Sequence, residues 1–157
     1  MRSRGVRLLT LLAVFSAGCG GTPTTPSTPA AGTIYRQATL RLEQTFTLDL
    51  DTGILPPGLG LGADIWFQAV TDQQRYLTPM RSEGAAIAVY GQTAPGFSGC
   101  STARLSGTEI PIESLTAGLY VCARTSQGRI AEILVVEPAG PSSRTAALTI
   151  SYTTYNR

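Results

Sequence analysis

The chain has 157 residues, of which 14% are charged, and its twelve basic residues against ten acidic ones give a formal net charge of +2. All twelve basic residues are arginines, because the chain contains neither histidine nor lysine. This composition excludes Ser-His-Asp triads, Cys-His nucleophile pairs, Schiff-base lysines and histidine-ligated zinc. No basic stripe with interleaved aromatic residues runs along the chain, so nucleic acid is not an expected partner.

The first segment has the pattern of an export signal. Three arginines precede an apolar stretch, and small residues follow that stretch up to Cys19. A charged start, an apolar run of about 7–15 residues and small residues at its end are typical of a secretory signal peptide. The apolar run from Leu8 to Ala17 is shorter than the roughly 20 residues that span a bilayer. The sequence therefore predicts a cleaved signal peptide over residues 1–18.

Cys19 stands directly after this segment. The run Ser16-Ala17-Gly18-Cys19 resembles the lipobox of bacterial lipoproteins, with Ser16 where leucine is usual. The resemblance implies that the chain is cut before Cys19 and that the Cys19 thiol carries a lipid. An ordinary signal peptidase that cuts at the same bond without lipidation is the alternative. Because Gly20 is not the aspartate of the inner-membrane retention signal, the resemblance favours the outer membrane if the cell has one.

Residues 19–32 are predicted to form a disordered tether. After Cys19 the segment holds only Gly, Thr, Pro, Ser and Ala, so it has neither a charge nor a large apolar side chain with which to build a core. Its prolines favour an extended chain of about 3.1 Å per residue. The tether would hold a folded domain over residues 33–157 clear of the lipid headgroups.

Residues 33–157 carry β patterns. From Thr45 onward apolar and polar residues alternate strictly, which puts Phe46, Leu48 and Leu50 on one face and Thr45, Thr47, Asp49 and Asp51 on the other. We expect the apolar face to lie in the core and the polar face to meet water. Further apolar runs span residues 63–70, 85–90, 119–124, 129–136 and 144–155, with turn residues between them. Residues 119–136 are predicted to form a hairpin around Ser126-Gln127-Gly128.

Short strands separated by turns at this spacing predict an all-β domain, either a single antiparallel β-sandwich or a small barrel. Four pieces also resemble a recurrent β-domain of secreted and surface proteins of bacteria. The pieces are Phe46 to Gly53, Ala63 to Trp66, Val121 to Ile130 and Leu148 to Tyr155. Such domains have no assigned reaction, so the resemblance implies this fold and an envelope or extracellular location, and it brings no catalytic residue.

The chain has three cysteines, an odd number that lipidation of Cys19 would explain. Cys100 and Cys122 then remain in the domain. Because an exported domain lies in oxidising surroundings, we expect these two to form a disulfide, with two buried free thiols as the alternative.

The motif with a catalytic precedent is Asp51-Thr52-Gly53, which resembles the Asp-Thr-Gly of aspartic proteases. In those enzymes two copies of the motif share a proton, which for this chain would require a dimer. Asp49 lies on the same strand face, where a second charge disfavours a dry active site, and the motif is also ordinary turn sequence. Alternatively, Asp49, Asp51 and Asp64 supply calcium ligands, although no Asp-x-Asp-x-Asp-Gly loop is present. We expect solvated acids at a strand edge rather than either site.

The sequence thus favours a cell-envelope lipoprotein whose β-domain is a non-catalytic interaction or structural module without a cofactor. Its expected partners are the membrane, through the lipid on Cys19, and an envelope protein or polysaccharide. One alternative is an envelope polysaccharide-binding module, and the other is a dimeric aspartic hydrolase that uses Asp51. An exposed aromatic cluster would favour the polysaccharide binder, and the candidates for it are Tyr76, Tyr90, Phe97, Tyr120, Tyr152 and Tyr155.

Overall fold

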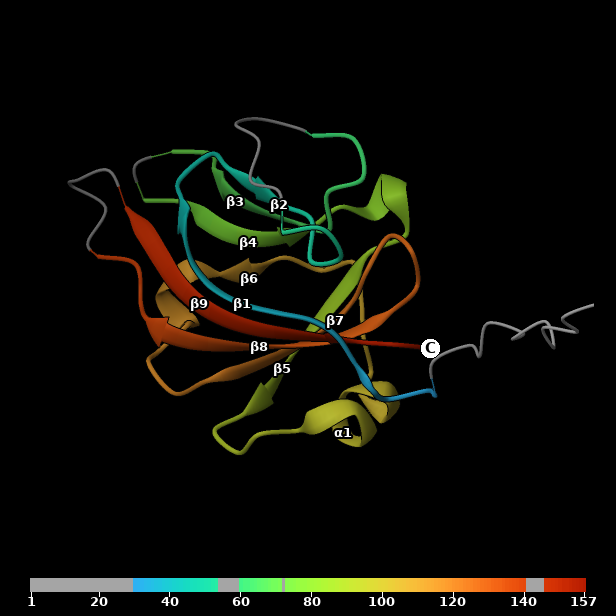
Figure 1. Ribbon diagram of the computed structural model, residues 1–157. Coiled ribbons are helices and arrows are strands. Elements are labelled where there is room, and N and C mark those ends of the chain that lie inside the picture. The colour runs from blue at the N-terminus through green and yellow to red at the C-terminus, as the bar shows by residue number, and fades with distance from the viewer. Residues whose placement is uncertain (1–29, 54–59, 72, 141–145) are drawn as a thin grey trace, which may run out of the picture.

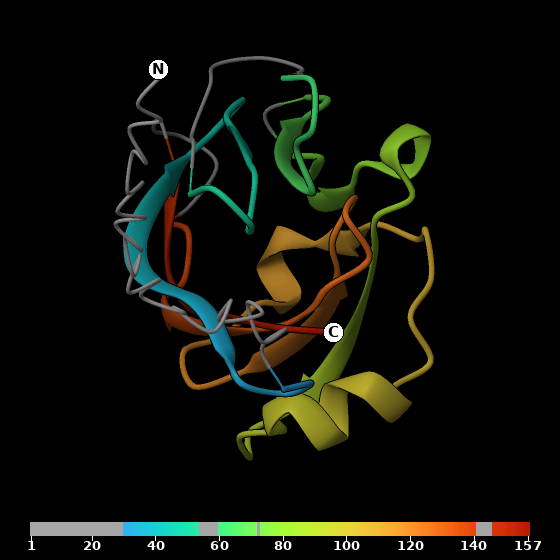
Figure 2. The ribbon, with the colours of Figure 1, turned by 45° about the vertical axis from the view of Figure 1, so that its right-hand side comes forward.

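Two antiparallel sheets face each other in the computed structural model, which describes residues 30–53, 60–71, 73–140 and 146–157 (Figures 1 and 2). The larger sheet runs, in spatial order, through β1 (Ile34–Glu43), β9 (Ala147–Tyr155), β8 (Ile130–Glu137), β7 (Tyr120–Arg124) and β5 (Ala86–Gly91). The smaller sheet runs through β2 (Thr47–Leu48), β3 (Ile65–Ala69), β4 (Arg75–Pro79) and β6 (Ile110–Pro111). The sheets do not close into a barrel within these residues, so the β-sandwich prediction is confirmed.

Within the described residues, three short helices connect or cover the strands. They are the 3-10 helices η1 (Arg81–Glu83) and η2 (Ile112–Ser114) and the α-helix α1 (Gly96–Thr102). None of the described helices is long and apolar enough to cross a membrane.

The core lies between the two sheets and is built from alternating residues of each strand. In β9, Leu148 and Ile150 are fully buried, as the alternation predicted. In the smaller sheet, Phe67 of β3 and Leu77 of β4 belong to the same buried cluster. Burial of each such side chain stabilises the fold by about 1.5–3 kcal/mol. The run predicted over residues 144–155 contains β9, an inner strand of the larger sheet that is hydrogen-bonded to β1 on one side and β8 on the other.

The predicted strand from Thr45 to Leu50 is shorter in the structure, since β2 spans only Thr47–Leu48. The expectation that its polar face meets water holds for Thr45, which is exposed, and is wrong for Thr47 and Asp51. Thr47 has no exposed surface and lies opposite Trp66 in the ladder with β3, and Asp51 is 3% exposed. The apolar face is as expected for Leu48 and Leu50, both of which are fully buried.

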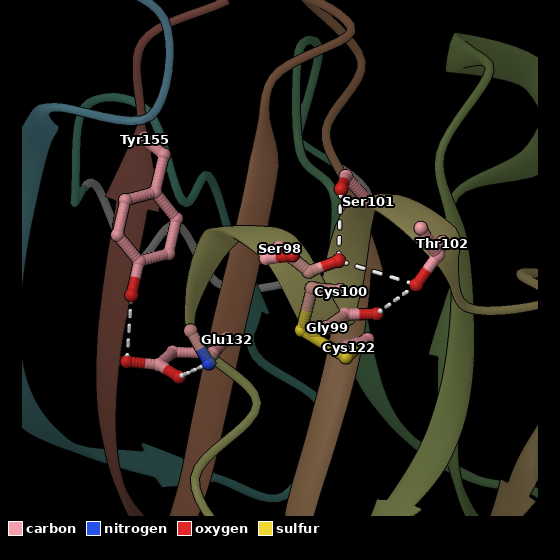
Figure 3. The surroundings of a disulfide bond; sticks show 9 residues. Ser98, Gly99, Cys100, Ser101, Thr102, Cys122, Glu132 and Tyr155 are labelled. Carbon is pink, nitrogen blue, oxygen red and sulfur yellow. Dashed lines mark hydrogen bonds between the residues drawn. A yellow bond between two sulfur atoms is a disulfide. The ribbon is translucent and has the colours of Figure 1, made fainter.

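A disulfide fixes α1 to the larger sheet (Figure 3). Cys100 of α1 bonds to Cys122 of β7, with the two Cα atoms 5.1 Å apart. This is the pairing expected from the sequence. Cys122 lies opposite Glu132 of β8, and both alternate with core residues, so the disulfide lies on the outer face of the sheet.

Glu132 is the second point of attachment for α1 (Figure 3). One of its carboxylate oxygens accepts a hydrogen bond from the Gly96 backbone nitrogen at 2.9 Å, and the other accepts one from the Tyr155 hydroxyl at 2.8 Å. Phe97 meets the Tyr155 ring edge to face, with the ring centroids 5.8 Å apart. A seven-residue helix rich in Gly and Ser is marginal alone, so these contacts to the sheet are what stabilise it.

The two ends of the domain lie side by side. The Gly32 backbone nitrogen donates to the Asn156 carbonyl, and the Asn156 backbone nitrogen donates to the Thr33 carbonyl. The predicted tether therefore joins the domain beside the end of β9.

Candidate functional site

Asp64 holds three loops together at one end of the sandwich. One of its carboxylate oxygens accepts a hydrogen bond from the Leu50 backbone nitrogen at 2.8 Å, and the other accepts one from the Ser126 backbone nitrogen. The Ser126 hydroxyl in turn donates to the Gly62 carbonyl at 3.2 Å. The Thr154 hydroxyl donates to the Leu50 carbonyl at 2.7 Å, which attaches the same loop to β9. The loop after β2, the residue before β3 and the turn between β7 and β8 thus meet at one carboxylate.

Burial changes the acidity of Asp64, which has no exposed surface. Loss of solvation raises the pKa of its carboxyl from the ordinary 3.8 to about 6. The hydrogen bonds from Ser126 and Leu50 favour the ionised form and oppose this rise, whereas the nearby charge of Asp51 adds to it. Asp64 is therefore a carboxyl group that is partly protonated in mildly acidic solution.

Asp51 lies beside Asp64 and is also buried, which corrects the expectation of a solvated acid. Its side chain has no exposed surface, and its Oδ1 atom lies 3.3 Å from Nη1 of Arg129. Neither carboxylate oxygen accepts a hydrogen bond from any part of the chain that the structure describes. The strand pattern failed here because the partner that covers Asp51 comes from the distant turn between β7 and β8.

Asp49 completes the group and is half-buried. Its Oδ1 atom accepts hydrogen bonds from the backbone nitrogens of Asp51 and Thr52 at 2.8 and 3.1 Å, and its Oδ2 atom accepts one from the Thr52 hydroxyl at 2.7 Å. Asp49, Asp51 and Asp64 each offer an oxygen within 4.8 Å of the other two. We call these three residues the acidic cluster, and the structure thus brings together all three predicted acids.

Arg129 brings a positive charge to the acidic cluster. Its guanidinium stacks on the Tyr35 ring with 3.8 Å between the guanidinium carbon and the ring centroid. Its Nη1 atom also donates to the Gln127 side-chain oxygen at 2.7 Å. Arg129 is therefore held by three partners, of which Asp51 is one.

A second candidate site is a groove on the outer face of the smaller sheet, with a volume of about 440 Å³. In β3 and β4 the core residues alternate with partly exposed ones, so one face of this sheet is turned away from the core. We call the hollow on this face the β3–β4 groove. It is lined by Trp66, Gln68, Val70, Tyr76, Thr78, Pro79, Met80, Arg81, Ser82 and Glu109.

The floor of the β3–β4 groove combines two aromatic rings with two polar side chains. Trp66 lies opposite Thr78, and Gln68 lies opposite Tyr76, so the two rings are diagonal neighbours on one face. The Thr78 hydroxyl donates a hydrogen bond to the Gln68 side-chain oxygen at 2.8 Å, which orients the Gln68 amide. This bond does not involve the NH₂ group of the amide, which carries two hydrogen-bond donors.

The rim of the β3–β4 groove carries one ion pair. Arg81 of η1 contacts Glu109 at 3.1 Å, and both side chains are largely exposed. The two charges cancel, so this pair gives the groove no net charge.

The sequence did not single out this groove, although it held a signal for it. In β3, Trp66 and Gln68 alternate with buried apolar residues. In β4, Tyr76 and Thr78 alternate with buried residues of which one, Arg75, is charged. The pair Trp66 and Gln68 and the pair Tyr76 and Thr78 form one surface because β3 and β4 are neighbours, which the sequence alone does not show.

The other aromatic candidates do not join this surface. Tyr152 and Tyr155 are buried, and Phe97, a residue of α1, packs against Tyr155. Tyr120 lines a separate hollow of about 160 Å³ formed by residues of the larger sheet. Tyr90 is 46% exposed on β5. Of the six predicted platform residues, only Tyr76 lies in the β3–β4 groove.

Cys19, the predicted lipid site, lies outside the described residues, as do the signal peptide and most of the tether. No protein-family model, curated protein or solved structure matches this chain.

Proposed function

We propose that the chain is a non-catalytic binding module for an envelope polysaccharide, held at the cell envelope by a lipid on Cys19. The observation that carries the binding function is the β3–β4 groove with its two aromatic rings. A sugar ring presents C–H bonds on its faces and hydroxyls at its edges. Sites for such ligands combine apolar and aromatic walls with a few placed polar groups.

The chemistry of the groove points to a neutral saccharide. Trp66 and Tyr76 offer ring surfaces, while Gln68 and Thr78 offer hydrogen-bonding groups between them. The ion pair of Arg81 with Glu109 leaves no free positive charge from these two residues for a phosphate or uronate. A volume of about 440 Å³ lies within the range of about 300–1,000 Å³ of small-molecule sites.

The lipid anchor supports the envelope location from the sequence side. The lipobox resemblance ends at Cys19, and the segment after it has the composition of an extended tether. A tethered module would reach polysaccharide near the membrane surface, in the outer membrane if the cell has one.

The aspartic hydrolase is disfavoured by the burial of Asp51. A dyad across a dimer needs each carboxylate at a protomer surface, where the second can approach it. The Asp51 side chain has no exposed surface and pairs with Arg129 of its own chain. The acidic cluster would have to open before a second copy could reach it.

Affinity electrophoresis tests the proposed function. The purified mature chain should be retarded in a native gel that contains neutral polysaccharide extracted from the envelope of the producing cell. Tyr76→Ala should remove most of the retardation, because it deletes one ring of the groove. Tyr90→Ala is the matched control, since Tyr90 is an exposed tyrosine outside the groove. Unchanged migration of the folded wild type in every extracted polysaccharide would contradict the proposal.

A further inference from the structure

We propose that Asp49, Asp51 and Asp64 form a calcium site at the end of the sandwich. The site is separate from the β3–β4 groove and does not rest on the proposed function. Calcium takes six to eight oxygen ligands at 2.3–2.6 Å, and carboxylates are its preferred protein ligands.

The spacing of the acidic cluster fits one shared ion. Two oxygens that each lie about 2.4 Å from one calcium can be at most about 4.8 Å apart. The three carboxylates meet this limit, since their ligand atoms all lie within 4.8 Å of one another. Backbone carbonyls and water would complete the coordination, as they do in other calcium sites.

The state of Asp51 is the second, independent observation that points to a cation. Its side chain has no exposed surface, and no described residue donates a hydrogen bond to either of its oxygens. Buried carboxylates are ordinarily hydrogen-bonded, ion-paired or bound to a metal, because an unsatisfied buried charge is unfavourable. Only the Oδ1 atom of Asp51 has a recorded ion-pair contact among the described residues, the one to Arg129. The Oδ2 atom has neither an ion pair nor a hydrogen bond within the part of the chain that the structure describes.

The charge of the cluster exceeds what Arg129 can balance. Among the described residues, Arg129 is the one guanidinium in ion-pair contact with the cluster, through Asp51, so Asp49 and Asp64 have no ion-pair partner there. A second arginine, Arg36, lies against Gly53 and donates to the Tyr152 hydroxyl at 3.1 Å. With all three carboxylates ionised, one divalent cation would offset the charge of the two acids that have no ion pair.

Arg129 competes with the ion for Asp51, but the position of its guanidinium does not depend on Asp51 alone. Its guanidinium also stacks on Tyr35 and donates to Gln127. It therefore keeps two partners when calcium takes the Asp51 carboxylate. A variant that lacks the Arg129 charge should bind calcium more tightly, because the guanidinium lies beside Asp51 and would repel a calcium ion bound there.

The ligand chemistry selects calcium over other common metals. All three side chains are hard oxygen ligands, whereas zinc and copper sites favour nitrogen and sulfur ligands. The three carboxylates come from a loop and from the residue before a strand, an irregular set that suits calcium better than the strict octahedron of magnesium.

Isothermal titration calorimetry on the mature chain, after removal of divalent ions with a chelator, tests the site. Calcium should give saturable heat with a Kd in the range of about 10⁻⁴–10⁻³ M that extracellular calcium modules show. Magnesium at the same concentrations should give little heat. Calcium should also raise the melting temperature, because it binds the folded state.

Variants distinguish a calcium site from a purely structural cluster. Asp51→Asn should weaken calcium binding about tenfold or more, and Arg129→Gln should strengthen it several-fold. Glu43→Gln, which removes an exposed acid from β1, is the matched control and should leave the Kd unchanged. If Asp51→Asn does not fold, Asp49→Asn takes its place, because Asp49 is only half-buried.

Two results would overturn the proposal. One is the absence of saturable heat up to about 10 mM calcium in a wild type that is folded by circular dichroism. The other is calcium binding that Asp51→Asn or Asp49→Asn, in folded form, leaves unchanged.

Discussion

Nη1 of Arg129 lies 3.3 Å from Oδ1 of Asp51, and this contact joins the turn between β7 and β8 to the loop after β2. The two residues are far apart in the sequence and meet at the end of the sandwich that also holds Asp64. The ion pair is part of what keeps the three loops of this end in contact.

Arg129→Gln should destabilise the calcium-free protein by about 3 kcal/mol, because it leaves Asp51 buried without a positive partner. Urea unfolding in the presence of a chelator measures this. Arg124→Gln is the control, since Arg124 is an exposed arginine at the other side of the same turn, and it should cost under about 0.5 kcal/mol. Equal losses from the two variants would mean that the ion pair does not stabilise this end.

Removal of the disulfide should destabilise the domain by about 3 kcal/mol, the loop-closure value for two cysteines 22 residues apart. The change is the double substitution Cys100→Ala with Cys122→Ala, and the measurement is the urea midpoint under oxidising conditions. Non-reducing peptide mapping of the wild type should recover the two cysteine peptides as one linked species. A wild type whose midpoint does not fall on reduction would show that α1 does not need this bond.

Tyr155 predicts an alkaline loss of stability. Burial, followed by the hydrogen bond to Glu132 and its charge, raises the pKa of Tyr155 above its ordinary value of 10.0. The unfolded state therefore releases this proton at a lower pH than the folded state does. The contribution to stability is full below about pH 10 and is lost as the pH rises further toward the folded-state value.

Tyr155→Phe should remove this part of the alkaline loss, at a cost of about 1 kcal/mol at neutral pH for the missing hydrogen bond to Glu132. Urea unfolding of both proteins between about pH 8 and pH 11 measures the difference. Tyr90→Phe should keep the wild-type slope, because Tyr90 is exposed. Parallel pH profiles for wild type and Tyr155→Phe would contradict this account of Tyr155.

The anchor prediction concerns Cys19. Mature protein from the native host should begin at Cys19, carry acyl chains and partition into detergent, because stable attachment needs more than one acyl chain. Cys19→Ala should leave the chain unprocessed or release it from the membrane. Intact-mass measurement decides the point, and an unmodified Cys19 at the start of the mature chain would overturn it.

The sequence predicted the fold wherever one strand face is apolar along its length. The alternation around Leu148 and Ile150 identified β9, and two β-rich runs around a Gly-containing turn identified the hairpin of β7 and β8. The period of two is a local property of a strand, so a single sequence carries it.

Burial of polar residues was not predictable in this way. Asp51 and Thr47 read as solvent-facing, yet both are buried, because their surroundings come from other parts of the chain. Arg75 is a second example. It stands at an inward position of β4, 3% exposed, where it pairs with Glu113 and donates to the Gly140 carbonyl at 3.0 Å. Because Arg75 breaks the alternation of apolar and polar residues, β4 was not predicted from the sequence.

For the candidate sites too, the sequence named single residues but did not show which of them lie together in space. Asp49, Asp51 and Asp64 were named from the sequence, but that their carboxylates converge depends on the turn that carries Ser126 and Arg129. The β3–β4 groove was not named, because it needs the pairing of two strands of which only β3 had been identified.

The emission of Trp66 gives the most direct test of the proposed binding function. Trp66 is the single tryptophan of the chain and lines the β3–β4 groove, so its fluorescence reports on that surface alone. A titration in chelator with neutral envelope polysaccharide should change the emission saturably, and Tyr76→Ala should abolish the change while Tyr90→Ala keeps it. The chelator separates this result from the calcium site. Emission that stays constant throughout the titration of the folded wild type, or that saturates equally in Tyr76→Ala, would contradict the account.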